Sequence, residues 1–292
     1  MRRSRWCSRR ETTGSGKLKS HGELHGEVTT RCTHGSPYFQ FKRRGKFNPM
    51  KSFVIFKVGD TFPSLSAQLG DFDRWIINGI GPSTLPVTVV DPRTENALPD
   101  MDKVAAAVVT GSHSMVSDRA PWSENLAAWL RSAVEENIPV LGICYGHQLL
   151  AHALGGEVGY HPDGIELGTV CVSRTKAAND DPLFGGLPDE FPAHVVHRQS
   201  VLRLPPGAVR LACNDFEPHH AFRAGEIAWG VQFHPEFSAD AMSGYVTELT
   251  DASKPGALPR DSISGQVRAT SEAASLLPRF ASLVAKRMDA QA

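Results

Sequence analysis

Short apolar segments alternate with amphipathic ones along most of the chain from residue 50 onward. The apolar segments predict strands over 53–58, 86–90 and 104–109. Apolar positions at helical spacing predict one or two helices within 64–80 and a longer helix over 120–136. Continuous apolar strands that alternate with helices are typical of a mostly parallel sheet covered on both faces, so we expect an α/β fold.

The pattern changes after Gly156, where short strand-like segments follow one another with turn residues between them. They predict mixed or antiparallel strands added to the same sheet. Further on we expect a short helix over 238–249, a loop over 251–261, and a helical stretch over 262–288 that is interrupted or restarted at Pro278. The strand-like segments are 166–173, 194–197, 209–212, 219–222 and 227–233.

These patterns divide the chain into three parts. Residues 50–250 are expected to form one α/β domain, and 251–292 a helical C-terminal extension. Residues 1–49 show no helical or strand period and are predicted to be a disordered basic extension. Three explanations of it stay open: translation that starts at Met50, where a strand follows at once; a basic tail for an acidic partner; or an organellar transit peptide, which its three Glu residues disfavour.

Charge and cysteine content narrow the classes of function. Residues 1–49 carry twelve Lys or Arg against three Glu, a net charge of +9, whereas the remainder has a net charge of −9. An acidic body argues against nucleic acid as a partner. Five cysteines without a C-x-x-C pair fit the reducing cytoplasm, and Cys171 and Cys213 are expected in the core. No apolar run is long enough to predict a membrane span.

The stretch 138–156 combines an apolar strand, a sharp turn and a helix that ends at two glycines. Its turn, Gly142-Ile143-Cys144-Tyr145-Gly146, has the form of a nucleophile elbow with cysteine in place of serine. The glycines allow a strained turn, and the helix N-terminus favours a thiolate. The alternative is a buried cysteine that happens to end a strand. We predict that Cys144 is a nucleophile.

A cysteine nucleophile needs a base, and a second motif offers one. The apolar segment 227–233 delivers His234 at its end, and Glu236 follows one proline later. Pro235 fixes φ and stiffens the turn, so that the Glu236 carboxylate can reach back to the imidazole and orient it. The alternative is an exposed histidine with a solvated glutamate. The two motifs together predict the order cysteine, histidine, carboxylate.

The sequence GICYGHQ at 142–148 followed by HPE at 234–236 resembles the class I glutamine amidotransferases, over roughly 53–240. Within that family it resembles the glutaminase domains of GMP synthase-type enzymes. The resemblance implies a flavodoxin-like three-layer fold with added antiparallel strands. It also implies that Cys144 attacks the γ-carboxamide of glutamine, that His234 shuttles the proton and that Glu236 orients His234.

An oxyanion hole is expected beside the elbow. Tyr145, the first residue of the helix, can offer its backbone N–H to a tetrahedral intermediate. The second donor is expected in the turn after 104–109, where the resembled family has a Gly-Gly or Pro-Gly pair and this chain has Gly111-Ser112. Either of the two can donate, and a turn without a catalytic part is the alternative.

The resemblance also implies contacts with the substrate. Gln148 lies one helical turn after Cys144 and is expected to face the pocket. The segment 197–201 resembles the glutamine-binding segment of the family, which implicates His197, Gln199 and Ser200. Glu166 lies in a further segment of this kind, and ordinary surface polarity is the alternative for all of them. The histidines show no zinc-binding spacing, so neither a metal nor a cofactor is expected.

The expected reaction is hydrolysis of the γ-amide of glutamine through a γ-glutamyl thioester, with release of ammonia. No Gly-x-x-x-x-Gly-Lys-Ser/Thr motif is present, so the acceptor is expected on a separate ATP-dependent synthetase subunit. Two alternatives stay open: a free-standing hydrolase of γ-glutamyl peptides or conjugates, and a non-catalytic binding module with the same fold.

Overall fold

The computed structural model describes residues 51–94 and 97–291, and the side chain of Ser262 is left out of the description. The predictions for residues 1–49 therefore lie outside the described residues. Residues from 51 onward belong to one unit by their contacts, and those after 250 share its core. None of the helices in the described ranges has the length and apolar character needed to cross a membrane.

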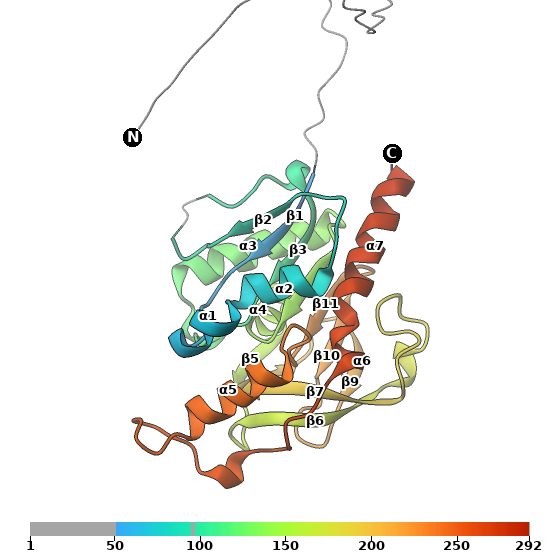
Figure 1. Ribbon diagram of the computed structural model, residues 1–292. Coiled ribbons are helices and arrows are strands. Elements are labelled where there is room, and N and C mark those ends of the chain that lie inside the picture. The colour runs from blue at the N-terminus through green and yellow to red at the C-terminus, as the bar shows by residue number, and fades with distance from the viewer. Residues whose placement is uncertain (1–50, 95–96, 292) are drawn as a thin grey trace, which may run out of the picture. The chain divides into compact units, whose positions relative to one another are not determined.

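A nine-stranded sheet runs through this unit in the order β2-β1-β3-β4-β11-β10-β9-β6-β7 (Figure 1). The first five strands of that order are parallel to one another, and the other four are antiparallel to their neighbours. A separate two-stranded sheet pairs β5 with β8. The strands are β1 (Ser52–Phe56), β2 (Val87–Val90), β3 (Val104–Val109), β4 (Val140–Ile143), β5 (Glu157–Tyr160), β6 (Glu166–Arg174), β7 (Glu190–His197), β8 (Gln199–Arg203), β9 (Val209–Cys213), β10 (Ala221–Ala224) and β11 (Ala228–Val231).

Helices cover the sheet on both faces, which confirms the expected α/β class. The α-helices are α1 (Pro63–Leu69), α2 (Phe72–Ile80), α3 (Pro121–Glu135), α4 (Tyr145–Ala153), α5 (Ala239–Thr250), α6 (Ser271–Ala274) and α7 (Leu276–Gln291). Single 3₁₀ turns lie at η1 (Met101–Lys103), η2 (Val116–Asp118), η3 (Lys176–Ala178) and η4 (Arg260–Ser262).

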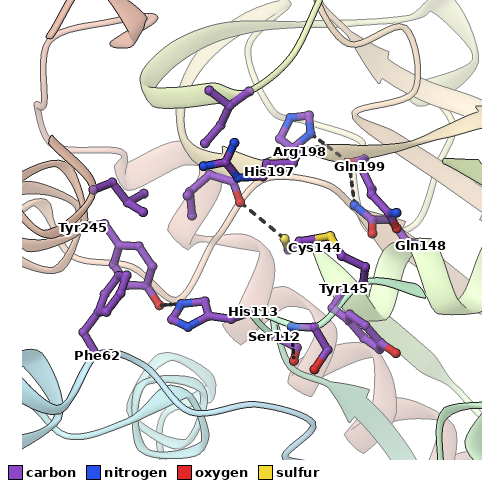
Figure 2. A pocket seen from close by; sticks show the side chains of 15 residues that line it. Phe62, Ser112, His113, Cys144, Tyr145, Gln148, His197, Arg198, Gln199 and Tyr245 are labelled. Carbon is purple, nitrogen blue, oxygen red and sulfur yellow. Dashed lines mark hydrogen bonds between the residues drawn. The ribbon is translucent and has the colours of Figure 1, made fainter. Parts of the chain in front are cut away.

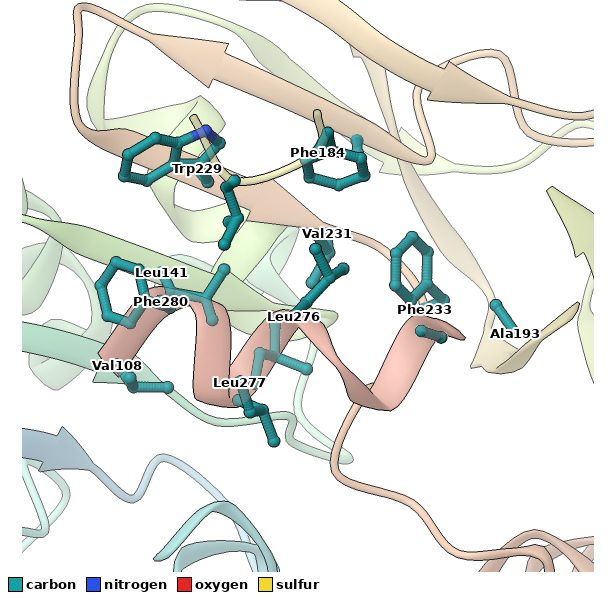
Figure 3. Close-up of a cluster of buried hydrophobic side chains, with 14 of the residues drawn as sticks. Val108, Leu141, Phe184, Ala193, Trp229, Val231, Phe233, Leu276, Leu277 and Phe280 are labelled. Atoms are coloured by element: carbon teal, nitrogen blue, oxygen red, sulfur yellow. The ribbon is translucent and has the colours of Figure 1, made fainter. Parts of the chain in front are cut away.

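Alternation along the strands explains the two-sided core. In β1, Phe53 and Ile55 pack in one cluster with α2, α6 and α7. Figure 3 shows the part of this cluster around Phe280 of α7. Val54 and Phe56 pack in another cluster with α3 and α4. Because side chains point alternately to the two faces of a strand, a sheet buried on both faces needs apolar residues at every position. Such strands read as continuous apolar runs, which is the pattern seen in the sequence.

The structure corrects several expectations about helices, strands and buried residues. The helical stretch expected from residue 262 begins at Ser271, because the preceding segment is extended beside β6, where Gly265 bridges Gly168. Pro278 is the third residue of α7, a first-turn position whose missing N–H costs no helical hydrogen bond. Cys171 is exposed, because it lies on the outward-facing side of β6. The strands β5 and β8 were not predicted.

Candidate active site

Two adjacent parallel strands bring the candidate catalytic segments together. Ile143, the last residue of β4, is in register with Val231, the last residue of β11. Cys144 follows at once and donates its backbone N–H to the carbonyl of Val231 over 2.8 Å. His234 lies three residues beyond β11. The site thus forms at the carboxyl ends of the strands, where open α/β sheets bind their ligands.

The elbow holds Cys144 in a strained backbone conformation. Its φ of 50° and ψ of −97° lie outside the regions that non-glycine residues usually occupy. Tyr145 begins α4 directly afterwards, so its N–H has no acceptor within the helix. The Tyr145 side chain fixes the turn against α3 by a 2.7 Å hydrogen bond with Ser123 and by stacking on Trp122. These contacts with α3 hold the residue that follows the strained Cys144 in place.

His234 lies between a carboxylate and the cysteine sulfur. Its Nδ1 donates to Glu236 Oε1 over 2.8 Å, and its side chain is 2% exposed. Burial alone would lower the pKa of His234, but the nearby Glu236 and Cys144 raise it to about 10. Nε2, the nitrogen opposite Glu236, has no hydrogen-bond partner among the described residues. The ring is therefore oriented by Glu236, and its Nε2 is left free of other hydrogen bonds.

Gly111, in the turn after β3, packs closely against this pair. A Cβ atom at Gly111 would lie 3.0 Å from His234 Cε1 and 3.9 Å from the Cβ of Cys144. The missing side chain lets the His234 ring and Cys144 approach the turn. Ser112 follows and lines the cavity in front of Cys144. The turn predicted to carry an oxyanion donor thus does lie beside the nucleophile.

A cavity of about 270 Å³ opens in front of Cys144 (Figure 2). It borders the Sγ atom, which lies 3.7 Å from the carbonyl of Val196. Arg198 is the sole Lys or Arg among its described lining residues, and its side chain makes no hydrogen bond or ion pair with another described residue. The lining residues are Phe62, Ser112, His113, Ser114, Met115, Cys144, Tyr145, Gln148, Ile165, Val196, His197, Arg198, Gln199, Tyr245 and Leu249.

Three of the predicted substrate contacts, Gln148, His197 and Gln199, line this cavity. The amide nitrogen of Gln148 donates to the carbonyl of Gln199 over 2.7 Å and to Gln232 Oε1 over 3.0 Å. Both protons of that nitrogen are then used, which leaves the amide oxygen of Gln148 to accept a hydrogen bond from a ligand. The side chain of Gln199 is held by Ser117.

The other two predicted contacts, Glu166 and Ser200, are buried and do not line the cavity. Glu166 accepts a hydrogen bond from His197 Nε2 over 2.9 Å and one from Asn214 over 2.7 Å. Burial alone would raise the pKa of Glu166, but the hydrogen bond from His197 and the nearby His220, whose Nε2 lies 3.4 Å from Glu166 Oε2, hold it well below its usual range. The carboxylate therefore fixes His197 from behind rather than facing the cavity.

Sequence reasoning missed nine of the fifteen residues that line the cavity, among them Phe62, His113, Arg198 and Tyr245. Arg198 could have been predicted, because it stands between His197 and Gln199, which were both predicted to contact the substrate. No sequence motif pointed to the other three: Phe62 lies in the loop before α1, His113 in the turn after β3, and Tyr245 in α5. A hydrogen bond of 3.1 Å joins His113 Nε2 to the Tyr245 hydroxyl across these elements.

No group of three or more His, Cys, Asp or Glu side chains within the described ranges could hold a metal ion. The side chains gathered at the site are a thiol, an imidazole and a carboxylate that is hydrogen-bonded to the imidazole.

Similar proteins of known sequence include a GMP synthase [glutamine-hydrolyzing] of Thermosipho africanus, 35% identical over 146 residues, which are 49% of this chain and 26% of that protein. A separate GMP synthase [glutamine-hydrolyzing] subunit of Archaeoglobus fulgidus is 39% identical over 103 residues, 35% of this chain and 54% of that protein. Gamma-glutamyl peptidase 5 of Arabidopsis thaliana is 30% identical over 145 residues, 49% of this chain and 58% of the peptidase. The chain thus spans between a quarter and three fifths of these relatives.

Among solved structures, a glutamine amido transferase from Methylobacillus flagellatus superimposes with a TM-score of 0.61 at 23% identity, over 82% of this chain and 95% of that one. This likeness supports the fold. The family model of class I glutamine amidotransferases matches residues 69–249, which include the elbow and the His-Pro-Glu turn. This chain therefore belongs to the class I glutamine amidotransferase family.

Proposed function

We propose that this protein hydrolyses the γ-amide of glutamine with Cys144 as nucleophile, His234 as general acid and base, and Glu236 as the group that orients His234. The observation that carries the proposal is the meeting of a strained Cys144 with the His234–Glu236 pair, joined over 2.8 Å, at the ends of two neighbouring strands. Cysteine nucleophiles with a positioned imidazole and a third orienting group recur in acyl transfer.

In the proposed reaction the Cys144 thiolate attacks the γ-carbonyl carbon and forms a C–S bond. His234 gives its proton to the departing nitrogen as the C–N bond breaks, so that ammonia leaves and a γ-glutamyl thioester remains. His234 then takes a proton from water, whose oxygen attacks the thioester. Glutamate is released and the thiolate is restored. The raised pKa of His234 favours the imidazolium that the first half of the reaction requires.

The oxyanion of each tetrahedral intermediate would be bound by two backbone N–H groups. We assign one to Tyr145, whose N–H begins α4 without a helical acceptor. Of the pair Gly111 and Ser112, we assign the other donor to Ser112, because Ser112 lines the cavity whereas Gly111 packs against His234. Fixed donors of this kind stabilise charge that develops in the transition state.

The glutamate part of the substrate would lie against Gln148, Gln199 and Arg198. The free amide oxygen of Gln148 suits the α-ammonium group as an acceptor. Arg198 suits the α-carboxylate, because its guanidinium has no other described partner. Glu166 and His197 act as positioning residues that hold this side of the cavity.

The relatives suggest two fates for the amine. The GMP synthases would imply that ammonia passes to a separate ATP-dependent synthetase, since the chain lacks the phosphate-binding motif named above. The γ-glutamyl peptidase would imply a free-standing hydrolase. We place either activity in the cytoplasm, because the nucleophile must stay reduced and the three described cysteines are free.

An ammonia-release assay with glutamine tests the proposal. Replacing Cys144 by Ala should lower kcat by about four orders of magnitude or more, as removal of other catalytic nucleophiles does. Cys213→Ala, at a half-buried cysteine on β9, is the matched control and should retain activity. Wild-type turnover by Cys144→Ala would refute the cysteine mechanism. Stimulation by a co-purifying synthetase would favour amide transfer, and unaided turnover of γ-glutamyl peptides would favour the free-standing hydrolase.

A further inference from the structure

The cavity in front of Cys144 has two chemically different sides. Figure 2 shows Gln148 and Gln199 on one side of Cys144, and Phe62 and Tyr245 on the other. The first side offers amide groups, and Arg198 also lines the cavity. The second side, which we call the apolar end, is formed by Phe62, Ile165, Tyr245 and Leu249. The proposed reaction uses the first side and gives the apolar end nothing to do.

The apolar end is the exposed rim of a hydrophobic cluster. Tyr245 is buried in that cluster, and Phe62, Ile165 and Leu249 pack against it while remaining partly exposed to the cavity. They come from the loop before α1, the residue before β6, and α5. Three separate parts of the chain thus converge to build one apolar wall beside the nucleophile.

The polar group within this wall is already satisfied. The Tyr245 hydroxyl lies 3.1 Å from Thr61 Oγ1 and 3.1 Å from His113 Nε2. Tyrosine hydroxyls in buried positions usually take such partners, which leaves the ring as an apolar surface. The ring of Phe62 packs on that of Tyr245 with centroids 5.0 Å apart. A ligand at this end would therefore meet aromatic and aliphatic carbon rather than hydrogen-bonding groups.

Free glutamine cannot use such a wall, because its leaving group is ammonia, which has no apolar surface to bury. A γ-glutamyl amide of a larger amine differs: with the glutamate part on the amide side and the carbonyl carbon at Cys144, its amine extends to the opposite side of the sulfur. We propose that the apolar end is a subsite for the leaving amine and that it selects γ-glutamyl amides of amino acids with large apolar side chains. This inference rests on the proposed function.

Hydrolysis of such an amide would follow the same steps as the proposed hydrolysis of glutamine. The amide C–N bond breaks as the C–S bond forms, His234 protonates the amino-acid nitrogen, and water hydrolyses the thioester to glutamate. The apolar side chain of the leaving amino acid buries carbon surface against Ile165 and Leu249 in the transition state. A single methylene in a hydrophobic pocket discriminates by roughly tenfold or more, so a leucine or phenylalanine side chain should be strongly preferred over glycine.

A substrate panel of glutamine, γ-glutamylglycine, γ-glutamylleucine and γ-glutamylphenylalanine tests this with the full chain. We expect kcat/KM for the leucine and phenylalanine amides to exceed that for the glycine amide and for glutamine by at least about tenfold. Equal values across the panel would overturn the subsite while leaving the cysteine mechanism standing. No turnover of any substrate, or turnover that survives Cys144→Ala, would instead refute the proposed function.

Substitutions in the apolar end test whether it causes the preference for large apolar leaving groups. Leu249→Ala and Ile165→Ala should each lower kcat/KM for γ-glutamylphenylalanine by about tenfold and change that for glutamine less than twofold. Leu98→Ala is the matched control, because Leu98 is also a partly buried residue at the edge of a cluster but does not line this cavity. Thermal unfolding of each variant checks that the fold persists. Equal losses on both substrates would show a structural role and overturn the subsite.

Discussion

The buried ring of His234 lies beside Glu236 and Cys144, which both favour its protonated form. Its pKa is raised from an ordinary value of 6.5 to about 10, against the opposing effect of burial, by Glu236 and by Cys144. A folded-state pKa above the unfolded value means that the charged ring stabilises the fold below about pH 6.5. That contribution is lost as the pH rises toward 10.

The first prediction separates the two causes. Cys144→Ala removes the sulfur but leaves Glu236, so the pKa of His234 should fall below its wild-type value while the ring remains bonded to Glu236. Histidine-labelled NMR titration of the two proteins measures the shift. Cys213→Ala should leave the titration unchanged. An unaltered His234 titration in Cys144→Ala would mean that the sulfur and the imidazole do not interact.

The second prediction concerns Arg198, which we assign to the α-carboxylate of the substrate. Arg198→Ala should raise KM for glutamine by roughly 10- to 100-fold, since a hydrogen bond to a charged group contributes about 1.5–3 kcal/mol. Because this contact forms equally in the ground and transition states, kcat should change little. Arg203→Ala is the control, because Arg203 is exposed on neighbouring β8 but does not line the cavity. A fall in kcat with constant KM would contradict the assignment.

Sequence motifs located the residues that act through fixed local geometry. Cys144 lies directly after β4, His234 and Glu236 lie in the turn that follows β11, and the adjacent ends of these two strands bring them together. The positions of Glu166 and Phe62 could not be obtained in this way. Glu166 begins β6, where its side chain points to His197 rather than into the cavity. Phe62 reaches the cavity only through tertiary packing, for which no spacing in the sequence gives a signal.

The strand–turn–helix element depends on two close backbone approaches. A Cβ atom at Gly142 would lie 2.3 Å from the carbonyl oxygen of Gly146, and one at Gly146 would lie 2.5 Å from the carbonyl oxygen of Val109. Backbone atoms cannot move aside as the end of a flexible side chain can. The turn can therefore form only if both positions are glycine.

The third prediction concerns the stability of this strand–turn–helix element. Gly142→Ala should destabilise the protein by on the order of 3 kcal/mol or more, since the strain of overpacking falls on backbone. Gly159→Ala in β5 is the control, because its nearest contact is the tip of the Leu202 side chain, which can turn away, and we expect a loss of less than about 1 kcal/mol. Urea unfolding measures both. Equal unfolding midpoints for the two variants would contradict this account of the elbow.

Elements with a strong apolar pattern were predicted well and weakly patterned ones were not. The strand expected over 104–109 coincides with β3, because it is buried on both faces. β5 and β8 were not predicted, because β5 is largely solvent-facing and β8 pairs only with β5. The segment before α6 was expected to be helical, yet Ser264 and Gly265 hydrogen-bond to Leu167 and Thr169 of β6. That edge pairing is a tertiary effect, which local propensity does not encode.

At the scale of the whole molecule, the residues beyond the family match complete the core. The family model ends at residue 249, and α7 lies well beyond it. α7 nevertheless packs on the sheet in the cluster that contains Phe53 and Trp229 (Figure 3). A Cβ atom at Gly79 in α2 would lie 2.3 Å from Leu277 Cδ1, so α2 and α7 are in close contact.

The fourth prediction tests whether α7 unfolds with the sheet. Phe280 is fully buried, with its ring 5.8 Å from that of Phe53 and 6.1 Å from that of Trp229. Phe280→Ala should cost about 3–5 kcal/mol, because the cavity it leaves lies between a helix and a sheet that cannot easily close. Lys286→Ala, at an exposed position of the same helix, should change stability by less than about 0.5 kcal/mol.

Urea unfolding followed by tryptophan fluorescence suits this test, because Trp229 contacts Phe280 directly. If α7 belongs to one cooperative unit with the sheet, the variant should show a single transition at a lower urea concentration with an unchanged slope. If α7 were an appendage, Phe280→Ala would leave the main transition in place and add an earlier one. The second outcome would mean that the segment matched by the family is stable alone. A single transition would mean that the sheet needs α7 to cover one face, because Phe53 and Trp229 would otherwise be exposed to water.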